Sequence, residues 1–432
     1  MGEPESDPRL VSLQKELKKL PHARHLRLLP YDDPRERGTR VVVDGLCKHV
    51  QLRLEDPETP AEEPPHRWAP RTLLNLTSPD VATGDADFDR AFHLVGSPPL
   101  LLALLGEETR QALGRIRWGP VPVSEIRLLD GELRLDVVDE GPRWRPRSRK
   151  HRHAVEQVAR LALEMIGALH EPADVWRLLA DNARRDIVPS VRLQNLTALV
   201  RGCPDHVVVH ETLKGATMDP DPDMRLLAGI ELRDEGLSIL EGLASSRRVE
   251  DGCSARAVEA LGPNLTTARA SGLLREALGP RAGIAVERPL TAGACVDLLE
   301  RRGEVAALRF VPWANGAVGL SGVKALERIG GAAENALASA LSIPDEERAV
   351  AIVKALGAVG SVAAVAALKE AARRGGKLKG AARQAIAEIQ ARVHGTPGQL
   401  SLAEGGKGGL TLVDEQAGQL SLPAPLRDRA KS

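Results

Sequence analysis

Apolar and polar residues alternate along two stretches in the first third of the chain. Residues 39–54 contain one such stretch, with the Asp44-Gly45 pair near its middle, and residues 125–138 contain the other, interrupted by Asp130-Gly131. A period of two is typical of β-strands, and Asp-Gly is a common hairpin turn. The pattern therefore predicts two β-hairpins, 39–43 with 50–54 and 125–129 with 132–138.

The segments around these hairpins predict further short elements. We expect helices over residues 10–20 and 99–117, and strands over residues 71–76 and 92–95. A connector rich in Pro and charged residues follows the first helix, through Arg37. Together these elements predict a small α+β domain over residues 39–141, preceded by an N-terminal helix and linker over residues 1–38.

From Ala154 onward the apolar residues recur at helical spacing, and the pattern itself repeats. Each predicted inner helix ends on an apolar residue, with a mostly branched apolar residue three positions earlier and mostly alanine four positions earlier. These ends are separated by 27–33 residues, apart from one interval of 68 that leaves room for a degenerate repeat, and they are Leu199, Leu232, Leu261, Ile329, Leu356 and Ile389. A repeat of this length is typical of stacked helical pairs.

These residues carry a resemblance to a known family. Residues 355–360 (ALGAVG) and 381–386 (AARQAI) resemble HEAT repeats of the short type found in phycobilin lyases. The Asp186/Arg192 and Asp219/Arg225 spacings resemble the HEAT-type Asp-x5-Arg pattern, which implies a partial hydrogen-bonded ladder between repeats. Residues 83–92 resemble the front domain of uncharacterised bacterial HEAT-repeat proteins. The resemblance implies a HEAT-type α-solenoid over residues 142–393.

Composition and charge narrow the possible functions. Aromatic residues make up only 2% of the chain, which favours helices that close on Ala and Leu. Lys plus Arg and Asp plus Glu both total 59, so the net charge is zero and a main role in binding polyanions is not expected. Four scattered cysteines and no apolar leader or membrane-length segment predict a cytoplasmic protein with reduced thiols.

Two features leave nucleic-acid binding open as an alternative. Six basic residues surround Trp144 between Pro142 and His153, an arrangement that could hold phosphates or form a solvated linker. Some HEAT-like proteins are DNA glycosylases, and Trp176 with Asp181, or Trp313 alone, could take that role. No motif of a nucleotide-binding loop, hydrolase or metalloprotease is present, so we expect no enzyme and no cofactor.

Two groups of residues have ligand-like spacing for a metal. Asp85, Asp87 and Asp89 alternate as calcium ligands do, but the glycine and glutamate of a calcium loop are missing, so a polar turn that caps a short element is expected. Cys203 with His206 and His210 lacks a fourth zinc ligand. Neither group predicts a metal site.

The candidate binding residues lie on the inner helices and in the tail. Lys324 and Lys354 break an apolar helix face without a stacking role and are predicted to contact a partner protein. Arg192 and Arg225 break it as well, but we expect them in the ladder. The tail, residues 394–432, repeats a Gly-x-Leu-Ser/Thr-Leu unit at intervals of ten, and each unit is a candidate short strand.

Three roles remain open for this tail. It could fold back onto the protein or stay a loose linker. It could add a strand to the edge of a partner's sheet. It could also dock on a bacterial sliding clamp, because Gln-Leu-Ser-Leu resembles the core of clamp-binding peptides. Its candidate contact residues are Gln399, Leu400, Leu402, Gln419, Leu420 and Leu422.

The sequence thus predicts a mainly α protein: an α-solenoid of HEAT-type repeats, preceded by a small α+β domain and followed by a flexible tail. The expected function is that of a non-catalytic scaffold that binds another protein, with no metal and no membrane contact.

Overall fold

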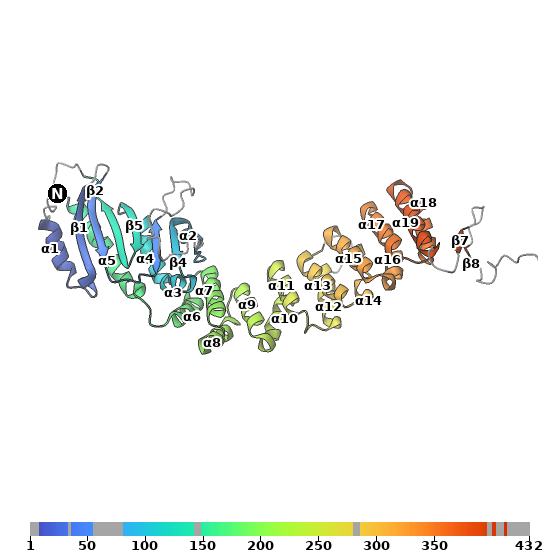
Figure 1. The fold of residues 1–432 in the computed structure, drawn as a ribbon, viewed down its shortest axis with the longest axis horizontal. Helices are drawn as coiled ribbons and strands as arrows, with labels where there is room; N and C mark the ends of the chain where they lie inside the picture. Colours follow the sequence, from blue (N-terminus) through green and yellow to red (C-terminus); the bar gives the residue numbers. More distant parts are fainter. Residues whose placement is uncertain are drawn as a thin grey trace, which may run out of the picture. The chain divides into compact units, whose positions relative to one another are not determined.

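The computed structural model of this chain describes residues 8–32, 36–54, 81–141, 148–279, 286–394, 400–402 and 410–412. The chain divides into two compact units, Met1–Gly236 and Leu237–Ser432. It is mainly helical, and a small antiparallel sheet lies in the first unit (Figure 1).

The sheet of the first unit has six strands in the order β1-β2-β6-β5-β3-β4, and every neighbouring pair is antiparallel. The strands are β1 (Leu26–Asp32), β2 (Arg37–Val43), β3 (Val50–Leu54), β4 (Phe92–Gly96), β5 (Val123–Leu129) and β6 (Glu132–Val138). Each strand contributes alternating apolar residues to one buried core, as its pleated geometry requires. These residues include Leu26, Val41, Leu52, Leu94, Ile126 and Leu135.

Of the two predicted hairpins, the structure confirms the second and corrects the first. β5 and β6 pair around Asp130-Gly131, and both residues of that turn have positive φ. β2 pairs with β1 and β6 instead of β3, while β3 lies between β5 and β4. The local Asp-Gly signal failed because β1, in the segment expected to be a connector, provides a longer partner for β2.

The helices of the first unit are those from α1 to α9. They are α1 (Pro8–Leu17), α2 (Ala86–Ala91), α3 (Pro98–Leu104), α4 (Glu107–Trp118), α5 (Arg149–Leu169), α6 (Val175–Arg185), α7 (Pro189–Gly202), α8 (Val207–Ala216) and α9 (Pro222–Glu231), with 3-10 turns η1 (Ala23–His25) and η2 (Arg233–Gly236). The predicted strand at 92–95 is β4, the single helix expected over 99–117 is divided at Gly106 into α3 and α4, and the strand expected at 71–76 lies outside the described residues.

Helix α5 belongs to the sheet although its sequence has the helical spacing of the later segments. It contacts β2 and β6, and its buried face, from Val155 to Leu169, joins the sheet core. Helices α1 and α4 pack beside it, on β1 and β5. A second apolar cluster, containing Leu179, Leu196 and Leu213, joins α6, α7, α8 and α9 to part of α3.

The second unit consists of helices that pack in a regular sequence. They are α10 (Leu237–Ser245), α11 (Asp251–Leu261), α12 (Thr267–Leu278), α13 (Pro289–Arg301), α14 (Val305–Leu308), α15 (Gly316–Ile329), α16 (Glu334–Ala340), α17 (Glu346–Val359), α18 (Ala364–Arg373) and α19 (Gly376–His394), with 3-10 turns η3 (Val311–Trp313) and η4 (Gly331–Ala333). The odd-numbered helices form a continuous series in which α11 packs on α13, α13 on α15, α15 on α17 and α17 on α19.

Four of the odd-numbered helices, α11, α13, α15 and α17, share one burial pattern, which begins at the seventh residue of each helix. Two buried residues are followed by one exposed residue, one that is partly or fully buried, and another buried residue. The pattern covers residues 257–261, 295–299, 322–326 and 352–356. The small or branched residues that precede the exposed position, such as Ala257 and Val258, are fully enclosed, which lets the neighbouring helix approach closely.

Two of the three tail units form short strands. β7 (Leu400–Leu402) and β8 (Leu410–Leu412) pair antiparallel, with Leu400 opposite Leu412. The third unit lies outside the described residues.

The division into units predicts that the second one folds alone. A fragment of residues 237–394 should give a strongly helical circular dichroism spectrum and a cooperative thermal transition, because each helix finds its neighbours within the unit. A fragment that starts at residue 142 instead exposes the buried face of α5, and we expect it to aggregate more. A coil spectrum for residues 237–394 would contradict this division.

Candidate functional site

Buried Arg–Asp pairs connect successive elements of the first unit. Arg110 donates to both carboxylate oxygens of Asp186, at 2.9 and 3.0 Å, and to Asp85 at 3.2 Å. Arg192 donates to both oxygens of Asp219, at 3.0 and 2.8 Å, and to the carbonyl of Asp186. Arg225 donates to the carbonyl of Asp219. Arg192 and Arg225 are therefore engaged in hydrogen bonds with residues of neighbouring segments, as expected of them.

In the second unit, arginines close the exposed ends of helices instead. Arg302 donates to the carbonyl of Gly262, and Arg374 to those of Leu341 and Ile343. Carbonyls at helix ends have no intrahelical partner, so each guanidinium satisfies acceptors that stacking would otherwise leave unpaired. Two further arginines do the same, Arg348 at Ala314 and Arg392 at Gly357 to Gly360.

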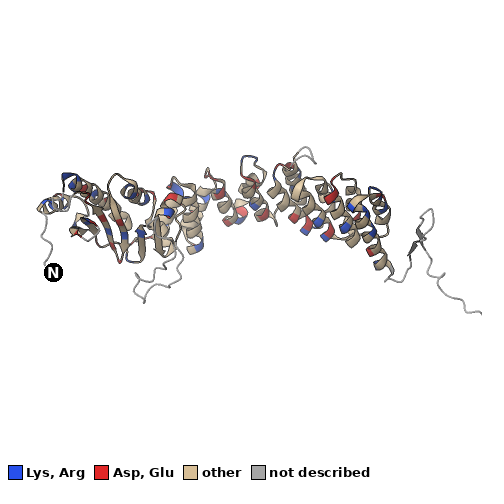
Figure 2. Cartoon of the chain, turned by 90° about the horizontal axis from the view of Figure 1, so that it is seen from above, with Lys and Arg blue, Asp and Glu red and all other residues tan. Residues whose placement is uncertain are grey.

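Lys324 and Lys354, the predicted partner-binding residues, occupy the same position on neighbouring helices. Each is the exposed residue of the shared burial pattern, Lys324 on α15 and Lys354 on α17. The same position on α13 is Asp297 and on α11 is Glu259, which the sequence reasoning missed. We call these four residues the charged row. Both signs of charge are spread over these helices in Figure 2.

None of the four side chains in the charged row has an ion-pair or hydrogen-bond partner among the described residues. Arg301 donates to the backbone carbonyl of Asp297 rather than to its carboxylate, and Arg328 pairs with Glu300 at 3.1 Å. The charged row is therefore free for an external partner, unlike the arginines that close helix ends.

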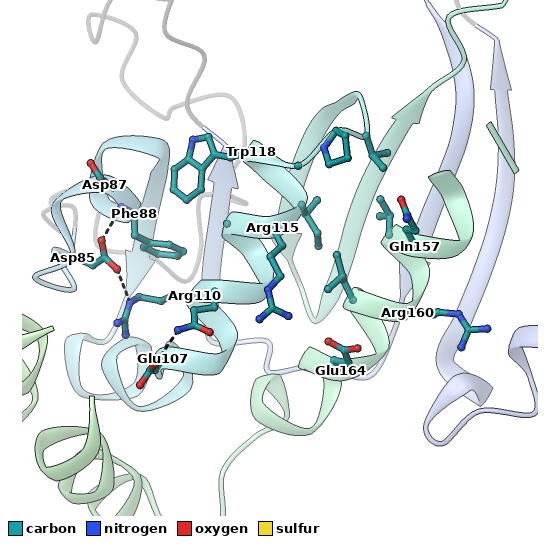
Figure 3. Close-up of a pocket in the computed structure, with 18 of the residues that line it drawn as sticks. Asp85, Asp87, Phe88, Glu107, Arg110, Arg115, Trp118, Gln157, Arg160 and Glu164 are labelled. Carbon is teal, nitrogen blue, oxygen red and sulfur yellow. Dashed lines mark hydrogen bonds and ion pairs between the residues drawn. The ribbon is translucent and has the colours of Figure 1, made fainter. Parts of the chain in front are cut away.

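The first unit contains a pocket of about 860 Å³ beside α4 and α5. Its apolar lining includes Phe88, Ile116, Val158 and Leu161, and Trp118, which also lines it, is 57% exposed. Figure 3 shows Arg115 on α4 and Glu164 on α5 beside this space. A second pocket, of about 480 Å³, shares Pro120, Val121 and Gln157 with it, so the two form one groove along α5.

Much of the charge around this groove is already used within its walls. Arg110 is held by Asp85 and Asp186, Gln111 donates to Glu107, and Arg160 donates to Glu156. Arg115 and Glu164 remain, with opposite signs. The groove can hold an apolar group but has no preference for one sign of charge.

The solvent-side face of the sheet carries a cross-strand line of arginines that the sequence did not reveal. Arg134 lies opposite Arg127, and Arg127 opposite Arg53. Like charges in register destabilise a sheet unless they are compensated. Glu132 contacts Arg134 at 3.3 Å and Glu125 contacts Arg127 at 3.6 Å, which compensates much of that charge.

The acidic turn at Asp85 caps a helix, as predicted. Asp85 accepts from the backbone N–H of Phe88, which places it at the N-terminus of α2. Asp89 accepts from the N–H groups of Thr83 and Gly84 and from the Thr83 hydroxyl. Phe88 and Phe92 stack with ring centroids 4.6 Å apart. The carboxylates of Asp85 and Asp89 are therefore occupied within the turn, and the exposed Asp87 pairs with Arg90 at 3.0 Å.

The remaining candidates are not brought together into a site. His206 caps α8 through Nδ1, which accepts from the N–H of Val208, and His210 lies 3.8 Å from Glu235. No group of three metal-binding side chains occurs in the described ranges. The ring of Trp176 packs against Gly202 and fills the space that a side chain at position 202 would need. Asp181 lies 3.9 Å from Arg184.

The structure describes few of the predicted tail residues. Leu400 and Leu402 lie in β7. Gln399, Gln419, Leu420 and Leu422 lie outside the described residues, as does the Trp144 segment up to residue 147.

No protein-family model matches the chain, and no curated protein matches it. Among solved structures, human deoxyhypusine hydroxylase in complex with glycerol matches with 16% identity and a TM-score of 0.22, covering 50% of this chain and 96% of that chain. No helix in the described part of the chain is long and apolar enough to cross a membrane.

One prediction is overturned by these comparisons. The chain was expected not to be an enzyme, on the basis of missing sequence motifs, but the matched solved structure is an enzyme. The prediction that the chain is not an enzyme is therefore withdrawn. With a TM-score of 0.22, the likeness shows neither a shared fold nor a shared reaction.

The buried ladder yields a prediction about stability. Arg110→Met should destabilise the first unit by about 3–5 kcal/mol, because it leaves the buried Asp186 carboxylate without its cation. Urea unfolding of the full chain measures this change. Arg115→Met, on the exposed side of the same helix, is the matched control and should change the free energy of unfolding by less than about 0.5 kcal/mol. Equal losses for both variants would contradict the role given to Arg110.

The cysteines yield a second prediction. Burial raises the pKa of the Cys295 thiol to about 12, whereas Cys203 is only partly buried. Thiolate is the reactive form, so at pH 8 the folded chain should be alkylated by iodoacetamide at Cys203 well before Cys295. Peptide mass spectrometry after a timed reaction measures the order. Faster labelling of Cys295 would show that α13 opens readily.

Proposed function

We propose that this chain binds another protein through a HEAT-type α-solenoid formed by its stacked helices. Support comes from the series of odd-numbered helices, each packed on the next, and from the burial pattern that recurs on four of them. In such an array each repeat contacts only its neighbours, which leaves one continuous helix face available for binding.

The observation that carries the proposal is the charged row. Charged side chains without partners add nothing to stacking, yet four of them stand at equivalent positions on successive helices. Exposed charges with this regularity fit a partner of complementary charge, because such charges accelerate encounter and fix register.

The signs of the charged row favour a protein partner over a nucleic acid. Glu259 and Asp297 are acidic, while Lys324 and Lys354 are basic. A polyanion that approached the two lysines would also meet the two carboxylates, and the chain as a whole has zero net charge. A protein can present both signs in the order required.

Charge reversal on the charged row tests this function. The double variant Lys324→Glu/Lys354→Glu should lose partner binding by at least about tenfold at low salt, because attraction becomes repulsion at two sites. The melting temperature should change little, since both side chains are exposed. Affinity capture from the native cell with quantitative mass spectrometry measures the proteins lost.

A matched control separates this effect from a general change in charge. Arg275→Glu/Lys369→Glu reverses two exposed cations on α12 and α18, outside the series of odd-numbered helices, by the same total charge. We expect it to retain every partner. Loss of the same proteins from both double variants, or a melting temperature that falls together with binding, would contradict the proposal.

A further inference from the structure

The charged row has a symmetry that specifies one kind of partner. Along α11, α13, α15 and α17 its charges run acidic, acidic, basic, basic. We infer that this face binds a second copy of the same chain in an antiparallel, two-fold arrangement. The inference rests on the proposed function, because it takes the charged row to be the binding surface and names what occupies it.

A two-fold axis between Asp297 and Lys324 makes the charged row complementary to itself. It places Asp297 of one copy opposite Lys324 of the other, and Glu259 opposite Lys354. A two-fold interface uses the same patch on both copies, so each contact occurs twice and the axis yields four ion pairs. A parallel arrangement would place like charges against one another.

The side chains fit this role because nothing else in the described structure uses them. All four are exposed and lack internal partners, so forming the pairs breaks no existing interaction. Helix α19, which follows α17 in the series, lacks the shared burial pattern, and its ninth residue, Gln384, is uncharged.

The face is large enough for a specific dimer. Neighbouring helices pack roughly 8–10 Å apart, so four helices span about 40 Å. Helices of 11 to 14 residues are about 16–21 Å long. The product, about 800 Å² on each copy, is the size of a standard specific interface.

The size of the full chain in solution, measured by sedimentation velocity between about 5 and 100 μM, tests the inference. At low salt we expect a monomer–dimer equilibrium that weakens at least tenfold at high salt, because the pairs are exposed. Two double variants, Lys324→Glu/Lys354→Glu and Glu259→Lys/Asp297→Lys, make the charged row wholly acidic or wholly basic. Each should be monomeric.

Two combinations of these substitutions test the charge pairing most directly. An equimolar mixture of the two should form a heterodimer, and the chain with all four charges reversed should again form a homodimer. The control Arg275→Glu/Lys369→Glu should dimerise like the unaltered chain. Circular dichroism must show the same helix content for every variant.

Three results would overturn the inference: a wild-type chain that stays monomeric at 100 μM and low salt, dimers that persist in both double variants, or a mixture that remains monomeric. None of these three results by itself contradicts the proposed function, which is binding to another protein. A monomeric chain that still loses captured proteins on Lys324→Glu/Lys354→Glu would retain the proposed function and reject the second copy as the partner.

Discussion

Close packing between successive odd-numbered helices is the constraint on which the second unit depends. Ala257, Ala325 and similar residues are fully buried there, so neighbouring helices approach without space for larger side chains. This contact fixes which residue of each helix remains outside. The regular position of Glu259, Asp297, Lys324 and Lys354 is therefore a consequence of packing, whereas their charges are not.

The same constraint explains how the chain treats its arginines. Where helices end, a guanidinium donates to carbonyls that lack an intrahelical partner, as Arg374 and Arg392 do. In the interior, Arg110 pairs with a buried carboxylate. A buried charge is tolerated only when it is paired. The four side chains of the charged row face solvent, so they do not need a partner within the chain.

Local sequence patterns predicted the element types well and their long-range pairing poorly. Alternation identified β5 and β6, and the repeat pattern placed Lys324 and Lys354 on exposed helix positions. The pairing of β2 with β6 joins residues up to 100 positions apart, as between Gly38 and Val138, and the Arg110–Asp186 pair joins residues 76 positions apart, so no local signal specifies them. The predicted repeat on α15 ended on Ile329, whereas the burial pattern ends three residues earlier at Leu326, so aligning the predicted ends does not bring Lys324 into register with Glu259.

Zero-length carbodiimide cross-linking of the full chain in its native cell tests the central claim most directly, because it joins a lysine only to a carboxylate that it contacts. The account predicts cross-linked peptides in which Lys324 or Lys354 is joined to an Asp or Glu of a bound protein, with Asp297 and Glu259 of a second copy among them. Recovery of cross-links at the exposed Lys369, with none at Lys324 or Lys354, would contradict it.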